Sequence, residues 1–195
     1  MFLIRKSQSL IFDCTYSIGS SDLDSLGSVY QCKAKILSAL QNDKRNDTLS
    51  DVTQNHLNGK NSSDADFIHI YQEVCPTIPK GIENFFPNLR GLYICSSGLR
   101  TVTRNDLKPL RNLIYLCLFE NFLVSLNSDL FISSPNIQYV NFGSNRRLRH
   151  VGRNIFKPLI NPKKIYFHDG VLCINKAAIT PDDIEQLKFD LADKC

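Results

Sequence analysis

Aliphatic and aromatic residues recur along this chain with a period of about 24 residues. One column of apolar positions, with steps of 24, 24, 24 and 25 residues, consists of Ile70, Ile94, Leu118, Phe142 and Phe167. A second column with the same steps consists of Ile68, Leu92, Leu116, Val140 and Ile165. One such unit cannot bury its apolar face alone, so neighbouring units are predicted to stack into one continuous core.

The best-formed unit spans residues 113–126, reads LIYLCLFENFLVSL and follows the pattern LxxLxLxxN with further leucines beyond it. This pattern, at a period in the twenties, resembles the leucine-rich repeat. The resemblance implies an α/β leucine-rich-repeat solenoid: a short curved horseshoe of about 24-residue repeats with parallel strands on its concave face. It also implies that the Asn bonds backbone groups of the turn, and that repeats lacking it turn less regularly. Two repeats have Asn at this position, Asn121 and Asn145, and the others have Glu73, Ser97 and Gly170 instead.

Both ends of the array are expected to carry caps, because terminal repeats of a solenoid expose core. Residues 29–37 alternate apolar and polar positions, which indicates a half-buried strand, and lysines on its polar face suit the edge of a sheet. With Cys14 and Cys32 this strand would form a disulfide-closed N-terminal cap over residues 14–48. The repeats then occupy residues 49–170 and start with an irregular unit at 49–57.

The C-terminal cap is assigned to residues 171–195. Thr180 as N-cap, Pro181 after it and acidic residues in the first turn predict a short helix. This helix places Cys195 near Cys173, and a bridge between these two fits the cap, although pairing cannot be deduced from sequence alone.

The chain has seven cysteines, and none forms a CxxC pair that would favour a zinc or thioredoxin-like site. The spacings 14–32 and 173–195 bracket the two ends as a disulfide framework would, which indicates an oxidising compartment. The N-terminus does not fit a secreted protein, because only four apolar residues precede Arg5, whereas a signal peptide needs roughly 7–15. We therefore expect residues 1–13 to be an atypical or misassigned start.

Repeats framed by cysteine caps resemble extracellular leucine-rich-repeat proteins, and more narrowly the short secreted ones of insects. The narrower resemblance rests on Cys14 with the YQC segment ending at Cys32, on the segments IPKGIENFFPNL, NSDLF and GRNIF, and on the C-terminal Cys. It implies a secreted, extracellular protein. Two sequons in a polar stretch, at Asn46 and Asn61, are then candidate glycosylation sites.

Positions between and beside the core columns are predicted to face the concave surface, because strand side chains alternate. Aromatic residues are concentrated there, and exposed aromatic side chains mark partner sites. The alternative is that Tyr and Phe simply suit strands. The predicted binding residues are His69, Tyr71, Tyr93, Tyr115, Phe119, Tyr139, Asn141, Tyr166 and His168.

Three cysteines remain outside the caps. Cys75 falls in a core column and is predicted to be a small buried hydrophobe. Cys95 and Cys117 are predicted to stand on the concave face of adjacent strands, two positions out of register. An ideal sheet then places their Cα atoms roughly 8 Å apart, whereas a disulfide needs about 4.4–6.8 Å. We therefore expect free thiols.

Composition narrows the function. A net charge of +4 with short basic clusters gives no case for nucleic acid, and no apolar run reaches the roughly 18 residues of a membrane span. No catalytic, cofactor or metal motif is recognisable. We expect a non-enzymatic binding protein without cofactor, whose partner is a protein or alternatively a glycan, in extracellular recognition or innate immunity. Its rivals are a cytosolic scaffold or inhibitor with reduced cysteines and a fragment of an adhesion receptor ectodomain.

Overall fold

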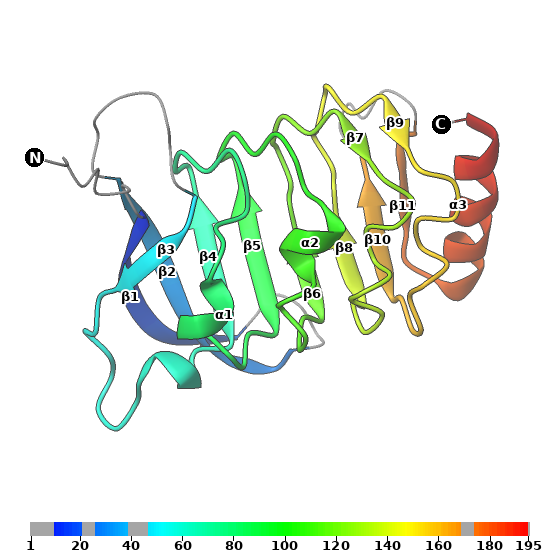
Figure 1. The fold of residues 1–195 in the computed structure, drawn as a ribbon. Helices are drawn as coiled ribbons and strands as arrows, with labels where there is room; N and C mark the ends of the chain where they lie inside the picture. The colour runs from blue at the N-terminus through cyan, green and yellow to red at the C-terminus, as the bar shows by residue number, and fades with distance from the viewer. Residues whose placement is uncertain (1–9, 21–25, 39–46, 169–173, 195) are drawn as a thin grey trace, which may run out of the picture.

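Parallel strands from successive coils run side by side in a computed structural model that describes residues 10–20, 26–38, 47–168 and 174–194 (Figure 1). Each strand begins about 24 residues after the one before it. The strands of the array are β4 (Phe67–Tyr71), β5 (Gly91–Cys95), β6 (Tyr115–Cys117), β8 (Tyr139–Asn141) and β10 (Lys164–Phe167). The leucine-rich-repeat solenoid that the sequence predicts is therefore confirmed.

The predicted core columns are also confirmed. Residues of the column that starts at Ile68 are direct partners across the parallel strands, and the column that starts at Ile70 continues it toward the carboxyl ends of the strands. All members of both columns are buried in one continuous core. Burial of so much apolar surface between neighbouring coils is the main force that holds the array together.

The turn after each of the first four strands of the array contains a left-handed residue, which the predicted Asn follows in two of them, at Asn121 and Asn145. Gln72, Ser96, Glu120 and Ser144, again 24 residues apart, all have positive φ. Asn121 is 3% exposed and accepts hydrogen bonds from the backbone N–H of Ser97 and Leu99 in the preceding coil, at 3.1 and 2.9 Å. Its Nδ2 donates to the carbonyl oxygens of Ile94 and Leu118. The Asn therefore satisfies buried backbone groups of two coils at once.

Short elements connect the strands on the other side of each coil. These are η1 (Ser62–Asp64), α1 (Ile82–Phe85), α2 (Arg104–Leu107) and the parallel pair β7 (Ser125–Leu126) and β9 (His150–Val151). Four phenylalanines pack ring against ring between these segments and the strands in the C-terminal coils: Phe131, Phe142, Phe156 and Phe167.

The N-terminal end is closed by an antiparallel hairpin of β1 (Leu10–Ser20) and β2 (Ser28–Ser38). A disulfide joins Cys14 to Cys32, as predicted, in the buried core. The predicted strand exists, but its placement at a sheet edge is wrong, because β2 pairs with β1 on one side and β4 on the other. The segment 49–57 does not stack on β4 either, since β3 (Leu49–Val52) pairs in parallel with β1 and forms the edge.

The C-terminal end is closed by β11 (Lys176–Ala178), antiparallel to β10, and by helix α3 (Pro181–Lys194). Asp183 N–H donates to Thr180 Oγ1 at 3.1 Å, while Thr180 N–H donates back to the Asp183 carboxylate at 3.0 Å. This reciprocal cap begins the helix where the sequence predicts it. The proposed bridge between Cys173 and Cys195 lies outside the described residues. Among the described helices, none combines the length and apolarity needed to cross a bilayer.

Candidate functional site

One row of side chains runs across the whole concave face. Strand register makes each member the direct partner of the next, from β2 through the array to β10. The row consists of Lys33, His69, Tyr93, Cys117, Asn141 and Tyr166. Lys33 was not predicted as a site residue, because only the parallel pairing of β2 with β4 shows that it adjoins His69.

His69 sits near the N-terminal end of this row. Its ring meets the Tyr93 ring edge-on, with centroids 4.3 Å apart, and its Nε2 is buried without a hydrogen-bond partner among the described residues. Loss of solvent around the ring holds the pKa of His69 below its ordinary value, and the nearby charge of Lys33 acts in the same direction. The imidazole is therefore kept neutral and part of the aromatic surface.

The side chains of Tyr115 and Tyr139 are not open to solvent, although the sequence places them on the concave face. They are 8% and 5% exposed and belong to a second apolar cluster with Leu26, Val29 and Phe67. Leu26 lies just before β2 and Val29 near its start, so the N-terminal hairpin packs against this part of the face. Burial raises the pKa of Tyr115 strongly, which keeps its hydroxyl protonated.

The remaining predicted residues stay accessible. Tyr71 is 47% exposed, while the others are half-buried, and all of them except Asn141 take part in ring contacts. His168 lies 5.5 Å from Tyr166 and 6.1 Å from Phe119, measured between ring centroids. The open part of the concave face, here called the open aromatic face, consists of His69, Tyr71, Tyr93, Phe119, Asn141, Tyr166 and His168.

The three cysteines of the repeats are free thiols in the structure, as expected for Cys95 and Cys117, and all are buried. Cys75 is in the main core, as predicted, and burial raises the pKa of its thiol to about 12. Cys95 and Cys117 are 0% and 3% exposed, so the expectation that Cys117 stands on the binding surface is wrong. Their sulfur atoms are 3.1 Å apart, and both residues belong to the second apolar cluster.

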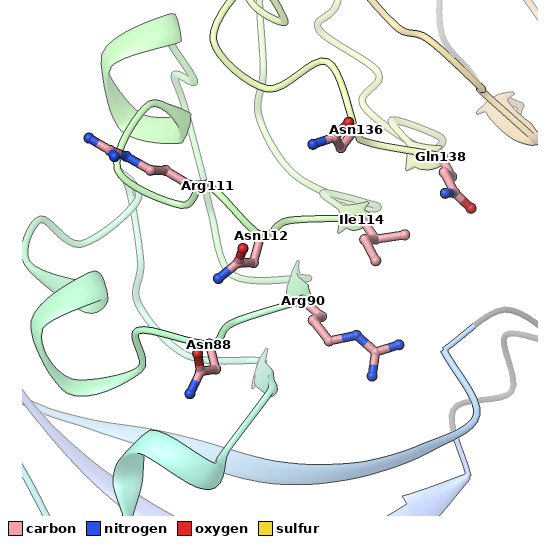
Figure 2. Close-up of a pocket in the computed structure, with 7 residues that line it drawn as sticks. All are labelled: Asn88, Arg90, Arg111, Asn112, Ile114, Asn136 and Gln138. Atoms are coloured by element: carbon pink, nitrogen blue, oxygen red, sulfur yellow. The ribbon is translucent and has the colours of Figure 1, made fainter.

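A groove of about 500 Å³ lies at the other end of the strands, in the loops that lead into β5, β6 and β8 (Figure 2). Two columns of residues with 24-residue steps line it together with Arg111, and the lining contains no carboxylate. Figure 2 shows amide and guanidinium groups projecting from three successive loops. The columns are Asn88, Asn112 and Asn136, and Arg90, Ile114 and Gln138. The 24-residue spacing of these polar residues in the sequence could have indicated that they share one side of the solenoid.

The loops that form this groove are held by hydrogen bonds to the preceding coil. Asn88 Nδ2 donates to the Ser63 carbonyl at 2.9 Å, and Asn112 Nδ2 donates to the Pro87 carbonyl at 3.2 Å. Arg90 bonds the Asp66 carboxylate at 3.2 Å and also the Leu26 carbonyl. The groove therefore has a fixed wall and one exposed arginine, Arg111, for which the described residues supply no side-chain partner.

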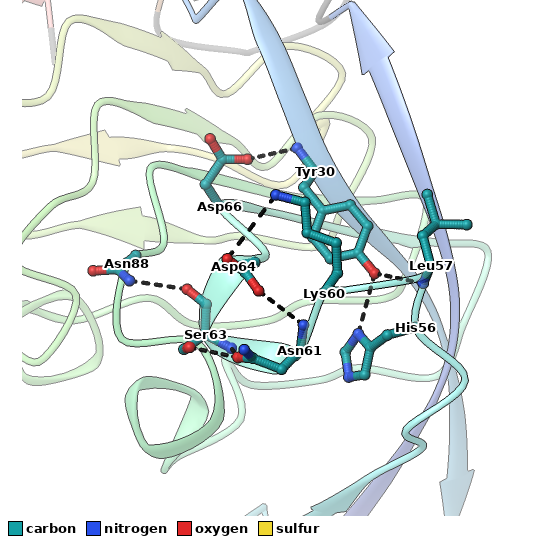
Figure 3. A network of polar contacts seen from close by, with 9 residues as sticks. All are labelled: Tyr30, His56, Leu57, Lys60, Asn61, Ser63, Asp64, Asp66 and Asn88. Carbon is teal, nitrogen blue, oxygen red and sulfur yellow. Dashed lines mark hydrogen bonds and ion pairs between the residues drawn. The ribbon is translucent and has the colours of Figure 1, made fainter.

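A polar network next to the groove ties the loop after β3 to the N-terminal hairpin (Figure 3). The Tyr30 hydroxyl bonds His56 Nδ1 at 3.2 Å and accepts from the Leu57 N–H at 3.1 Å. Asn61 is exposed, and its Oδ1 accepts from the backbone N–H and the hydroxyl of Ser63, at 2.9 and 2.5 Å. The other candidate glycosylation site, Asn46, lies outside the described residues.

Neither surface carries a recognisable reaction centre. Within the described residues no three His, Cys, Asp or Glu side chains converge as a metal site would require. The open aromatic face offers rings and a few polar tips, and the groove offers hydrogen-bond donors. Both surfaces offer groups that are common in binding interfaces.

The stacked coils, the inward Asn turns and the disulfide-closed end define this chain as a leucine-rich-repeat solenoid. No family model matches the chain, and no curated protein sequence matches it. A solved structure, that of the Toll–Spatzle complex, a molecular hub in Drosophila development and innate immunity, has a similar fold with a TM-score of 0.52 and 17% identity. The match covers 63% of this chain and 17% of that chain. This chain therefore spans less than a fifth of the length of its structural neighbour, and the likeness concerns the fold.

Proposed function

We propose that this protein is a non-catalytic extracellular binding protein whose open aromatic face holds a protein partner. The observation that carries the proposal is two groups of partly exposed rings in mutual contact on the parallel strands. They are His69 with Tyr71 and Tyr93, and His168 with Phe119 and Tyr166. Tyr and Phe provide large contact areas at low cost in conformational entropy, and such residues dominate the energetic centres of interfaces. A solenoid presents them on an extended curved surface that suits another macromolecule.

An extracellular site of action is part of the proposal. The disulfide between Cys14 and Cys32 supports it, because such bonds persist in oxidising compartments. The fold that the chain shares with the Toll–Spatzle structure is compatible with a role in recognition or innate immunity. The rival assignments, a cytosolic scaffold and a receptor fragment, would use the same surface.

The test compares two triple variants in capture of proteins from a display library of secreted proteins. Tyr71→Ser, Phe119→Ser and Tyr166→Ser together remove rings from the open aromatic face without touching the buried Tyr115 and Tyr139. We expect capture to be lost while the thermal unfolding transition persists.

The matched control replaces exposed aliphatic residues in the segments that connect the strands: Val124→Ser, Ile132→Ser and Ile160→Ser. The control should capture the same partners as the native protein. If the aromatic triple variant still captures them, the partner site lies elsewhere on the molecule.

A second candidate function is the binding of an acidic glycan in the groove at the amino ends of the strands. The specific observation is a lining of amide and guanidinium donors with no carboxylate. Arginine recognises carboxylate and sulfate groups through paired N–H donors. The coils repeat at about 4.8 Å, whereas an extended peptide advances about 3.3 Å per residue, so successive peptide groups would not match the Asn column.

A sulfated oligosaccharide serves as the probe, with a neutral dextran as its comparison. We expect Arg111→Gln to weaken binding of the sulfated probe severalfold and Arg100→Gln, an exposed arginine away from the groove, to leave it unchanged. Equal loss in both variants would show only nonspecific charge attraction and would reject the groove as a site.

A further inference from the structure

We propose that Cys95 and Cys117 form a disulfide that joins adjacent coils in the mature protein. Register pairs Tyr71 with Cys95 and Tyr93 with Cys117, so the two cysteines lie on neighbouring strands, two positions apart. Their sulfur atoms are nevertheless only 3.1 Å apart. A disulfide bond measures about 2.0 Å, so an approach of about 1 Å would complete it.

The reach of the side chains explains why a distance expected between Cα atoms misleads. Each Sγ atom stands two bonds away from its Cα, and its χ1 rotamer can direct it along the strand toward the other cysteine. The two Sγ atoms are therefore in contact at 3.1 Å across the diagonal.

The surroundings of the pair favour the bonded state. Cys95 and Cys117 are almost completely buried in a cluster with Tyr115 and Phe119 packed nearby. The Cys95 thiol contacts the Cys117 sulfur at 3.1 Å and the Cys117 carbonyl oxygen at 3.6 Å, and hydrogen bonds of a thiol are weak. Bond formation removes two poorly satisfied S–H groups from an apolar site. The Cys14–Cys32 bond is consistent with folding under oxidising conditions.

The oxidant is a small-molecule disulfide of the glutathione class, present while the chain folds. A thiolate attacks this disulfide, forms a mixed disulfide and releases the first small thiol. The second cysteine loses its proton, attacks the protein sulfur of the mixed disulfide and expels the second small thiol. The two cysteines thus lose two electrons and two protons, and the small disulfide gains them as two thiols. Because the folded pair excludes solvent, the exchange takes place before the strands close over it.

The contacts of the two sulfurs differ in the folded pair. A hydrogen bond from the Cys95 thiol holds the pKa of Cys117 below its ordinary value, whereas burial raises the pKa of Cys95. Cys117 is therefore the more acidic thiol of the closed pair. The completed bond would fix β5 to β6 beneath the open aromatic face.

Tryptic mapping of native protein, alkylated with iodoacetamide in denaturant without reductant, tests the proposal directly. The protein is first refolded in a glutathione redox buffer. Only material in which the Cys14–Cys32 bond has formed is used, and both of these cysteines lie in the tryptic peptide 7–33. Cys95 falls in peptide 91–100 and Cys117 in peptide 112–146. We expect these two peptides as one linked species that separates on reduction.

The same digest contains its own control, because Cys75 lies in peptide 61–80 and should be recovered alkylated. Cys95→Ser should leave Cys117 recovered alkylated, and the linked species should disappear. Recovery of both Cys95 and Cys117 as alkylated thiols from native protein overturns the proposal. Partner binding plays no part in this measurement, so its outcome is independent of the proposed function.

Discussion

Phe67 on β4 lies across Gly91, its direct partner on β5. A Cβ added to residue 91 would overlap the Phe67 ring, and the ring in turn lies 5.8 Å from the Tyr115 ring, measured between centroids. The absence of a side chain at position 91 therefore allows the second apolar cluster to form on the concave side. The buried Tyr115 and Tyr139 belong to this cluster, and Tyr93 and Phe119 of the open aromatic face pack against it.

Gly91→Ala should destabilise the protein, because the added methyl group displaces the Phe67 ring from a packed cluster. Overpacking of this kind costs about 1–3 kcal/mol in the free energy of unfolding. Urea denaturation of the single variant measures it. In a Phe67→Ala background the same change should cost much less, since the obstructing ring is gone. Equal costs in both backgrounds would disprove the steric account.

Asn121→Ala should be more harmful than Ser97→Ala, although both residues occupy the same position of the repeat. Loss of Asn121 leaves the buried N–H groups of Ser97 and Leu99 without their acceptor, at about 1–3 kcal/mol for each unsatisfied donor. Ser97 Oγ donates to the Cys95 carbonyl at 2.8 Å and accepts only a long bond, 3.4 Å, from the Glu73 N–H, so its loss should cost about 1 kcal/mol. Denaturant midpoints of the two variants would contradict this ranking if they were alike.

Features that recur in every repeat could be predicted from the sequence, and features that occur once could not. The columns at Ile68 and Ile70 and the turn at Asn121 repeat with one period. The pattern of one repeat therefore predicts the structure of the next. The sequence of strand β1 matches no other repeat, and the strand starts at Leu10, in a segment that we interpreted as an atypical N-terminus.

The accessibility of the candidate site was the least predictable property. Alternation places Tyr115 and Tyr139 on the concave side correctly, but their burial depends on contacts with Leu26 and Val29, which are distant in sequence. The same applies to Cys117, whose burial follows from neighbours on other strands. Periodicity gives the direction of a side chain, whereas tertiary packing decides whether solvent reaches it.

Asn61 should carry a glycan when the protein is produced through a secretory pathway. The residue is exposed, and its Oδ1 already accepts from the Ser63 hydroxyl within the sequon. Intact mass before and after enzymatic deglycosylation should show that Asn61→Gln and Ser63→Ala each remove the same glycan. Asn58→Gln, an exposed Asn outside any sequon, is the matched control and should leave the mass of the attached glycan unchanged. An unaltered glycan mass in Asn61→Gln would exclude this site.

His69 should make the protein less stable in mild acid. Burial and Lys33 lower the pKa of His69 in the folded state, whereas the unfolded chain has an ordinary value of about 6.5. As the pH falls below about 6.5, the unfolded chain binds more protons than the folded one, so the free energy of unfolding decreases; above that pH the contribution is fully present.

The measurement for His69 is denaturant unfolding at pH 7.5 and pH 5 of the native protein and of His69→Gln. The loss of stability between these two pH values should be smaller in the variant, because glutamine does not titrate. His56, whose pKa burial also lowers, remains in both proteins and cancels in the comparison. An identical pH dependence in the two proteins would show that His69 is not held neutral by the fold, and that its environment on the concave face is wetter than its contact with Tyr93 indicates.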